Sequence, residues 1–270
     1  MTQLSAPPGY GIAVEVGGLA VLLHTLDPDF ARMLRERYQG FVNPSAQPSI
    51  EFDVDLVGPS GTDPEEDVQV QFQSGRWSFR RGDFRADWDP GSGRGHIRQL
   101  PNPYSVDSLL RIVHSIVLAK EGGFLLHAAS IVRGGRAFLF SGISGAGKTT
   151  MSRLAPPDVR LLTDEVSYIR LLAEGYCAFG TPFAGELARV GENVAAPIAA
   201  VYLLAKGPEN RVDPLSRSEV IRLLLRNVLF FAQQPDLVPR IFDAACAFAA
   251  RVPVQRLTFF PDQRVWEMIR

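Results

Sequence analysis

The chain has 270 residues, with 28 Lys and Arg against 29 Asp and Glu, 46% hydrophobic residues and two cysteines. This length allows one or two domains with a large buried core, which argues against a small disulfide-stabilised scaffold. The net charge of −1 lacks the positive excess of a nucleic-acid-binding surface, so we expect no nucleic-acid partner. Cys177 and Cys246 lie in no C-x-x-C pair and are expected to be buried, inert thiols.

The sequence carries no sign of a membrane or secreted protein. The N-terminus has no basic start followed by an apolar run, as a signal peptide would have. The longest apolar stretch, Val194–Ala205, has 12 residues, whereas a helix needs roughly 18 to span a bilayer. We therefore expect a cytoplasmic protein without a membrane partner.

The first hundred residues have the pattern of a β-rich domain. Apolar residues alternate with polar ones in two segments, formed by Ile50, Phe52, Val54 and Leu56 and by Val68, Val70 and Phe72. Glycine-containing turn signals separate the short runs. We predict a β-meander over residues 10–99, interrupted by one helix from Pro28 to about Tyr38 that Asp27 caps.

A loop rich in Pro, Gly and Asn, residues 89–103, marks a domain boundary near residue 101. The predicted domains are therefore a β-rich N-terminal domain over 1–101 and a second domain over 102–270. A helix capped by Ser105 is predicted to open the second domain and to end at Gly122. The later predicted elements are a hairpin of strands 124–132 and 137–141, a buried strand over 196–205, helices beginning at Ser216 and Pro235, a strand over 257–260 and a short final helix.

A glycine-rich loop joins the second strand of this hairpin to a predicted helix. Residues 142–149, GISGAGKT, match G-x-x-x-x-G-K-[ST] at every fixed position. Glycines let successive backbone N–H groups point at one anion, and the lysine brings a full charge to the β and γ phosphates. The alternative is a glycine-rich turn with a solvated lysine. The motif predicts an ATP site formed by Gly142, Ser144, Gly145, Ala146, Gly147, Lys148, Thr149 and Thr150, with Mg²⁺ on Thr149.

An acidic pair follows this loop closely. A predicted strand over 159–163 ends in Asp164 and Glu165. A carboxylate at the end of a neighbouring strand can hold Mg²⁺ or accept a proton, so both residues are candidate metal ligands. Consecutive strand residues point to opposite faces, so both carboxylates reach the phosphates only where the strand twists or ends. The alternative is a solvated strand end.

Four segments resemble the HPr kinase/phosphorylase family and its relatives on the phosphoenolpyruvate-carboxykinase-like fold. They are LLHAASIV (125–132), GISGAGKTT (142–150), LLTDE (161–165) and FGTPFAGE (179–186). The resemblance implies an α/β fold, a mixed-sheet P-loop kinase core beside the β-rich N-terminal domain. It also implies an ATP-dependent kinase acting on a serine hydroxyl, with Asp164 as catalytic acid/base, Glu165 as magnesium ligand and His127 near the transferred phosphate.

The chain departs from that family's pattern in two places. Glu165 stands where the family has Asp, and the arginine-bearing C-terminal loop has no counterpart that we find. Arg189 is therefore our candidate for contacting the γ phosphate, with Lys206 and Arg211 as weaker candidates. A surface role is the alternative for each cation, and a structural role is the alternative for His127. His24, His96 and His114 are expected to be structural.

The leading hypothesis is an ATP- and Mg²⁺-dependent kinase that phosphorylates a hydroxyl of a protein, a peptide or a small molecule. The second is an ATP-binding regulator or scaffold that transfers no phosphate, and the third is carboxykinase chemistry on an oxoacid. Under the first hypothesis the N-terminal domain is a candidate for acceptor recognition. Whether the chain forms a homo-oligomer is left open.

Two further segments have alternative interpretations. Residues 181–186 form either a mobile loop that closes over substrate or a plain connection. Residues 76–98 carry six arginines, at positions 76, 80, 81, 85, 94 and 98, against aspartates at 83, 87 and 89. These charges either dock an acidic partner or form a solvated strand face.

Overall fold

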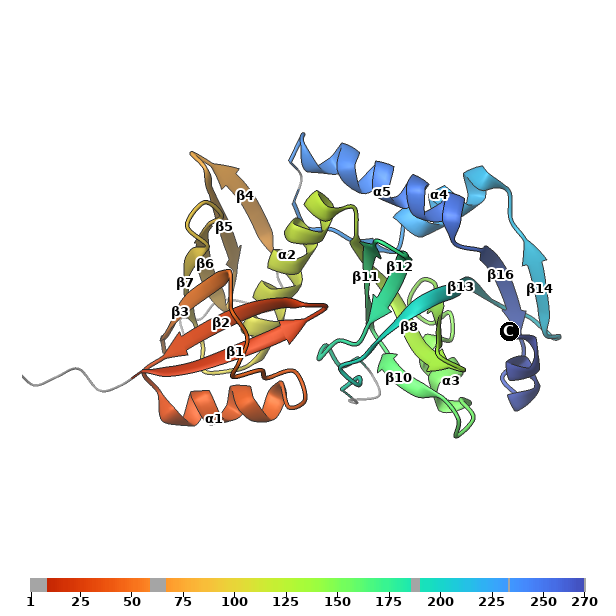
Figure 1. Ribbon diagram of the computed structural model, residues 1–270, viewed down its shortest axis with the longest axis horizontal. Coiled ribbons are helices and arrows are strands. Elements are labelled where there is room, and N and C mark those ends of the chain that lie inside the picture. Colours follow the sequence, from red (N-terminus) through yellow and green to blue (C-terminus); the bar gives the residue numbers. More distant parts are fainter. Residues whose placement is uncertain (1–8, 59–66, 186–189, 233, 270) are drawn as a thin grey trace, which may run out of the picture. The chain divides into compact units, whose positions relative to one another are not determined.

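The computed structural model (Figure 1) describes residues 9–58, 67–185, 190–232 and 234–269. These residues form a mixed α/β structure with two mixed sheets, and the N-terminal region is rich in β-strands. The described chain divides into two compact units. The first runs to Val113 and includes 231–234, and the second holds His114–Phe230 and Pro235–Arg270. The division falls inside helix α2, Tyr104–Glu121.

The first unit contains one mixed sheet and helix α1. Its described elements are β1 Tyr10–Val16, β2 Leu19–Thr25, α1 Pro28–Arg37, β3 Ile50–Leu56, β4 Gln69–Gln73, β5 Arg76–Arg81, β6 Phe84–Asp89 and β7 Arg94–Gln99. The strand order is β1-β2-β3-β7-β6-β5-β4. One face of β5, β6 and β7 is buried through Trp77, Phe79, Phe84, Trp88 and Ile97, as alternation requires.

The predicted meander is correct for only part of this sheet. Strands β4 to β7 pair consecutively and antiparallel, and β1 pairs with β2 as a hairpin. Strand β3, however, is parallel to both β2 and β7. Helix α1 lies between β2 and β3 in the chain, and a crossover of this kind is what makes a parallel neighbour accessible. The alternation of β3 predicted its buried face and not the direction of its neighbours.

The two predicted caps in this unit have different outcomes. Asp27 caps α1 as predicted, because its side chain accepts a hydrogen bond from the Phe30 N–H at 2.8 Å. The prediction for Ser105 is wrong, since α2 begins at Tyr104 and its first amides donate to Oδ1 of Asn102. The Ser105 hydroxyl is buried and instead donates to Asp83 at 2.7 Å. Ser105 therefore makes a long-range hydrogen bond to Asp83 instead of capping its own helix.

The second unit contains the longer sheet and most of the helices. Its described elements are β8 Phe124–Arg133, β9 Arg136–Ser141, α3 Lys148–Arg153, β10 Arg160–Thr163, β11 Val166–Leu172, β12 Gly175–Phe179, β13 Ala195–Lys206, β14 Arg211–Pro214, α4 Arg217–Leu225, β15 Val228–Leu229, α5 Leu237–Arg251, β16 Val254–Phe259 and the 3-10 helix η1 Gln263–Met268. The described strands follow the order β10-β8-β11-β12-β13-β16-β14, with β9 between β8 and β13 and β15 beside β8. The capping box of α4 forms as predicted.

Helices cover both faces of this sheet. Phe248 of α5 packs edge-on against Phe124 of β8 and Tyr176 of β12. The part of α2 in this unit covers the other face, where His114 packs against Tyr168. On that second face a core that includes Met151, Phe140, Phe259 and Trp266 packs beneath α3. The helix that follows the glycine-rich loop is therefore held against the core through Met151.

The burial of His114 predicts that the free energy of unfolding depends on pH. Its ring is fully buried, with Nδ1 3.2 Å from the Tyr168 hydroxyl, and burial lowers its pKa to about 3. The unfolded chain binds a proton at about pH 6.5, so between pH 6.5 and 3 the unfolded state holds more protons than the native state. Stability therefore falls as the pH decreases through this range, by about 2 kcal/mol between pH 7 and pH 5.

Urea denaturation at pH 7 and pH 5 measures this loss, with a His114→Gln variant as the comparison. The variant is expected to lose about 2 kcal/mol less over the same interval, whatever its stability at pH 7. The other histidines are common to both proteins and cancel in the comparison. An equal pH dependence in the two proteins would contradict the assignment to His114.

The cysteines differ from the prediction in their exposure. Cys177 and Cys246 are both free in the described structure, and each is half-buried rather than fully buried. Burial and the charge of Glu174 raise the pKa of the Cys177 thiol, which fits the predicted low reactivity.

Of the described helices, none combines the length and the apolar character needed to cross a bilayer.

Candidate functional site

The site is built around strand β8, which changes partners near its middle. On one edge it pairs with β11 up to His127 and then with β10 from Ser130, and on the other edge it pairs with β15 at Leu125 and Leu126 and then with β9 from Ala128 onward. Strand β9 ends where Ser141 lies opposite Ala128, and the glycine-rich loop follows directly. On the other side of β8, the Ala128 N–H donates to the carbonyl of Glu165 at 3.1 Å. The loop and the acidic pair therefore flank Ala128 on the two opposite edges of β8. Two strand spacings separate them, which is about 10 Å.

The glycine-rich loop, residues 142–147, is a tight backbone curl. The Ala146 N–H donates to the Ile143 carbonyl at 3.0 Å. Gly145 and Gly147 have φ values of 75° and 111°, which favour glycine. Gly147 also lies against the core, because a Cβ at this position would be 2.5 Å from the Phe259 ring. Ile143, Ser144 and Gly145 are exposed at the tip, so the curl is open to solvent.

Lys148 is the first residue of α3 and is buried despite its charge. Its Nζ donates to the Gly142 carbonyl at 3.0 Å and lies 3.4 Å from the Ile143 carbonyl. A buried ammonium requires such partners, and these two belong to the start of the same loop. Lys148 thus places a positive charge inside the curl and helps to hold its shape.

The acidic pair lies in a bend between β10 and β11. Strand β10 ends at Thr163, whose hydroxyl accepts hydrogen bonds from the N–H groups of Glu165 and Val166, each at 3.2 Å. Because the strand ends here, the two carboxylates are not forced to opposite faces. Asp164 is buried at 3% exposure, while the side chain of Glu165 is 30% exposed.

Gly185 brings the two carboxylates together. Its N–H donates to Oδ1 of Asp164 at 2.9 Å. A Cβ on Gly185 would lie 2.6 Å from Oε2 of Glu165 and 3.2 Å from Oδ2 of Asp164, so both side chains lie against this glycine. Sequence reasoning did not assign Gly185 to the site. Its segment was singled out as part of FGTPFAGE, one of the four resembling segments, and as a turn-forming loop, 181–186, that could close over substrate.

His127 lies beside the acidic pair. Its Nδ1 is 3.7 Å from Oε1 of Glu165, and the side chain is 25% exposed. The backbone of His127 is held on both sides, since its N–H donates to the Asn227 carbonyl at 2.7 Å and its carbonyl accepts from the Ser141 hydroxyl at 2.9 Å. A pair of this kind is charged only when the imidazole is protonated. The ring is thus carried on a fixed backbone and lies beside Glu165.

The structure describes two of the three remaining candidate cations, Lys206 and Arg211. Arg189 lies outside the described residues, as does Glu186. Arg211 lies on β14, where its Nε donates to Asp213 at 2.8 Å, and its side chain is 69% exposed. Lys206 ends β13 and lies in register with Phe259 of β16.

The described part of the segment 181–186, which ends at Gly185, is packed. The buried Thr181 hydroxyl donates to the Val166 carbonyl at 3.0 Å, and Phe183 is 1% exposed. These anchors fix the start of the segment next to β11 and so position Gly185 at the carboxylates. As far as Gly185, the chain therefore has the contacts of a packed connection.

The oxygen donors of Thr149 and of the acidic pair suit a hard cation shared with a ligand. Thr149, Asp164 and Glu165 offer one hydroxyl and two carboxylates, and Mg²⁺ is commonly held by one or two carboxylates together with substrate phosphates. Among the described residues, no group of three or more His, Cys, Asp or Glu is arranged to bind a metal by itself. The donor set therefore fits Mg²⁺ that arrives with a phosphorylated ligand.

Comparison with known proteins decides the family. A family model described as SynChlorMet cassette protein ScmC matches residues 104–270, which is well over half of the chain. The chain belongs to the ScmC family. Among curated proteins, none matches the sequence.

Membership of the ScmC family corrects the expected relationship to the HPr kinase/phosphorylase family, which is wrong. That expectation rested on short segments between residues 125 and 186. A phosphate-binding loop and a following acid are short motifs that recur in unrelated protein families, so they do not define a family. The ScmC match begins at Tyr104, the first residue of α2, and the sheet of the first unit lies outside it.

Proposed function

We propose that this member of the ScmC family is an ATP- and Mg²⁺-dependent phosphotransferase that phosphorylates a hydroxyl group. One observation carries the proposal. The glycine-rich loop and the acidic pair flank Ala128 of β8 from its two sides, and both carboxylates lie against Gly185. Under this proposal β9, the loop and α3 form a P-loop kinase core.

The loop supplies the phosphate site in this proposal. Amides of residues 142–147 and the ammonium of Lys148 would bind the β and γ phosphates, because they combine hydrogen-bond donors with a buried positive charge. Thr149 and Glu165 would hold Mg²⁺, which when bound neutralises charge on the phosphate oxygens. The partial exposure of Glu165 is compatible with a ligand shared with solvent.

Asp164 would take the proton from the acceptor hydroxyl. It is the more buried carboxylate, and the Gly185 N–H donates to its Oδ1 and so holds its orientation. A carboxylate held in this way can remove a proton as the hydroxyl oxygen attacks the γ phosphorus and the bond to the β-phosphate oxygen breaks. His127, 3.7 Å from Glu165, would keep that carboxylate in place. The acceptor is a hydroxyl of a protein, a peptide or a small molecule.

Incubation of the full chain with γ-labelled ATP and Mg²⁺ tests this proposal, with free serine and serine-containing peptides as candidate acceptors. Lys148→Met keeps the aliphatic stem and removes the ammonium. We expect this variant to lose transfer and hydrolysis by about 100-fold or more, because charge on the γ phosphate is no longer neutralised. Lys120→Met, the same change at an exposed lysine of α2, is the matched control and should retain activity.

Three outcomes would contradict the kinase hypothesis. Absence of ATP binding would remove the phosphate site altogether. Tight binding with the triphosphate intact after hours would instead indicate a nucleotide-binding regulator or scaffold. Nucleotide turnover that requires oxaloacetate would indicate carboxykinase chemistry.

A further inference from the structure

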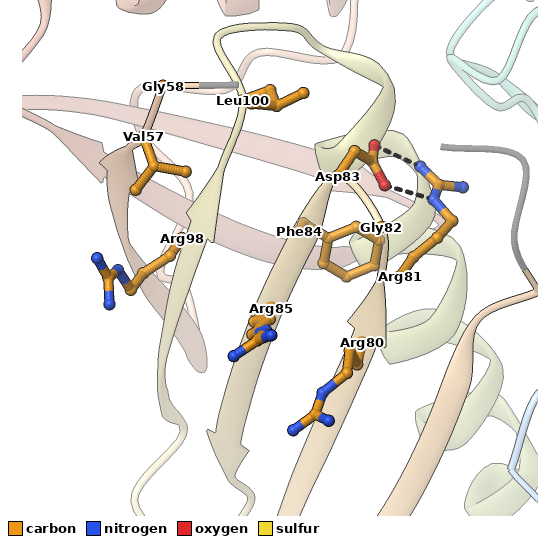
Figure 2. Close-up of a pocket in the computed structure, with 10 residues that line it drawn as sticks. All are labelled: Val57, Gly58, Arg80, Arg81, Gly82, Asp83, Phe84, Arg85, Arg98 and Leu100. Atoms are coloured by element: carbon orange, nitrogen blue, oxygen red, sulfur yellow. Dashed lines mark hydrogen bonds and ion pairs between the residues drawn. The ribbon is translucent and has the colours of Figure 1, made fainter. Parts of the chain in front are cut away.

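The outer face of the first unit's sheet carries an unusual row of arginines. Arg80, Arg85 and Arg98 lie directly opposite one another on β5, β6 and β7, in the pairs Arg80↔Arg85 and Arg85↔Arg98. Figure 2 shows the three side chains side by side across these neighbouring strands. Directly opposed residues in an antiparallel sheet have Cβ atoms about 5 Å apart, so like charges at such positions destabilise the sheet. We call these three residues the arginine row.

The other arginines of this region already have partners. Arg81 pairs with Asp83 at 2.6 Å, and the dashed lines of Figure 2 mark this pair. Arg76 pairs with Asp87 at 2.6 Å and lies 3.8 Å from Asp89. Arg94 lies 3.3 Å from Glu51. The three aspartates of residues 76–98 are thus used by Arg76 and Arg81.

In the part of the chain that the structure describes, the arginine row has no such compensation. The guanidinium groups of Arg80, Arg85 and Arg98 make no hydrogen bond or ion pair with another described residue, and all three residues are exposed. Asp55 lies opposite Arg98 on β3, but its carboxylate contacts Nε2 of His96 at 2.8 Å. A solvated strand face of mixed charges would alternate its signs, as the neighbouring rows do. The arginine row instead concentrates positive charge on a chain whose net charge is −1.

Two adjacent hollows share these arginines. The larger, of about 370 Å³, is lined by all three and by the apolar side chains of Val57 and Leu100 (Figure 2). The smaller, of about 130 Å³, is lined by Arg80, Arg85 and polar side chains that include Gln69, Gln71 and Ser78. Both lie on an exposed sheet face, whereas a small-molecule site usually encloses most of its ligand. An elongated ligand fits this arrangement better than a compact one.

From this geometry we infer that the arginine row is a docking site for an acidic polypeptide segment. The row spans about 10 Å across two strand spacings, and same-side residues of an extended chain repeat every ~7 Å, so two or three carboxylates can face it. Guanidinium groups bind carboxylates through paired N–H donors. An apolar side chain between the acids can fill the hollow beside Val57 and Leu100. This inference does not depend on the proposed phosphotransfer.

Fluorescence anisotropy with the full chain tests this inference. The probe is a fluorescein-labelled ten-residue peptide of Glu, Leu and Ser, and the comparison peptide has Gln in place of every Glu. We expect the acidic peptide to bind at least about tenfold more tightly, and its affinity to fall as salt rises from 50 to 300 mM. Arg85→Gln, at the centre of the row, should weaken binding about fivefold, the upper end for one exposed ion pair.

Arg94→Gln is the matched control, since Arg94 lies on the same face of β7 and is already paired with Glu51. It should change the affinity less than about twofold, as expected for an exposed residue outside the contact. Thermal melting checks folding, and Arg85→Gln should melt no lower than the parent because it relieves repulsion. Equal binding of the Gln peptide, equal loss in Arg94→Gln, or tighter Arg85-dependent binding of citrate or a single-stranded oligonucleotide would overturn the inference.

Discussion

Replacing Asp164 by Asn is expected to slow phosphoryl transfer by about 10²–10⁴-fold, the contribution of a positioned general base. The substitution preserves shape, and the amide oxygen can still accept the hydrogen bond from the Gly185 N–H that now holds Oδ1. What the variant loses is the capacity to accept a proton. Nucleotide affinity should therefore stay within about threefold of the parent, because the phosphate site itself is unchanged.

Single-turnover transfer from labelled ATP and equilibrium binding of a fluorescent ATP analogue measure the two quantities separately. Glu165→Gln is the informative comparison, since Glu165 lies against the same glycine but is more exposed. As a metal ligand it should raise the Mg²⁺ concentration needed for half-maximal activity. If Glu165→Gln abolishes transfer while Asp164→Asn keeps it, the two roles are reversed.

Replacing Gly147 by Ala is expected to destabilise the protein by about 2–4 kcal/mol and to abolish nucleotide binding, because two separate costs meet at this residue. The first is the φ of 111°, which L-residues rarely adopt. The second is steric, since the added Cβ would lie 2.5 Å from the Phe259 ring. Relief of that clash must displace either the buried ring or the loop that precedes Lys148.

Gly135, in the turn between β8 and β9, separates the backbone cost from the steric cost. Gly135 has a φ of 75°, and a Cβ at this position would meet nothing within 4 Å, so Gly135→Ala carries the backbone cost alone. Urea denaturation should show Gly147→Ala to be less stable than Gly135→Ala by about 1–3 kcal/mol. Adding Phe259→Leu should recover part of the stability of Gly147→Ala, since the smaller side chain makes room. Equal losses at the two glycines would show that Phe259 does not constrain the loop.

Local features of the fold were predictable because neighbouring residues encode them. The alternation of Ile50, Phe52 and Val54 gave the buried face of β3, and Asp27 gave the start of α1. The two glycines of the β8–β9 turn, Gly134 and Gly135, both have the positive φ that a tight hairpin needs. In each case the signal lies within a few residues of the structure it specifies.

Long-range arrangements could not be predicted in the same way. The parallel placement of β3 depends on partners far away in the chain, and Ser105 contacts Asp83 instead of its own helix. Hydrophobic periodicity says which face is buried and does not say which element covers it. The family assignment failed for a related reason, since short motifs describe local chemistry and the match over 104–270 describes the chain.

The candidate site was predictable in its residue types and not in its geometry. The motif singled out Lys148, and the strand end singled out Asp164 and Glu165. Gly185, which touches both carboxylates, was missed because its approach is a tertiary contact. The arginine row could not be predicted either. Only the strand register shows that Arg80, Arg85 and Arg98 lie opposite one another, whereas the arginines beside them are paired with acids.

The partner change in β8 has a consequence for how this protein can vary. The backbone at His127 and Ala128 positions both the loop and the acids, although the loop ends at residue 147 and the acids begin at residue 164. Inserting or deleting one residue in β8 would move one set of partners past the other and invert every side chain beyond it. Length changes among relatives should therefore accumulate in connections such as that between β13 and β14, while β8 keeps a constant number of residues.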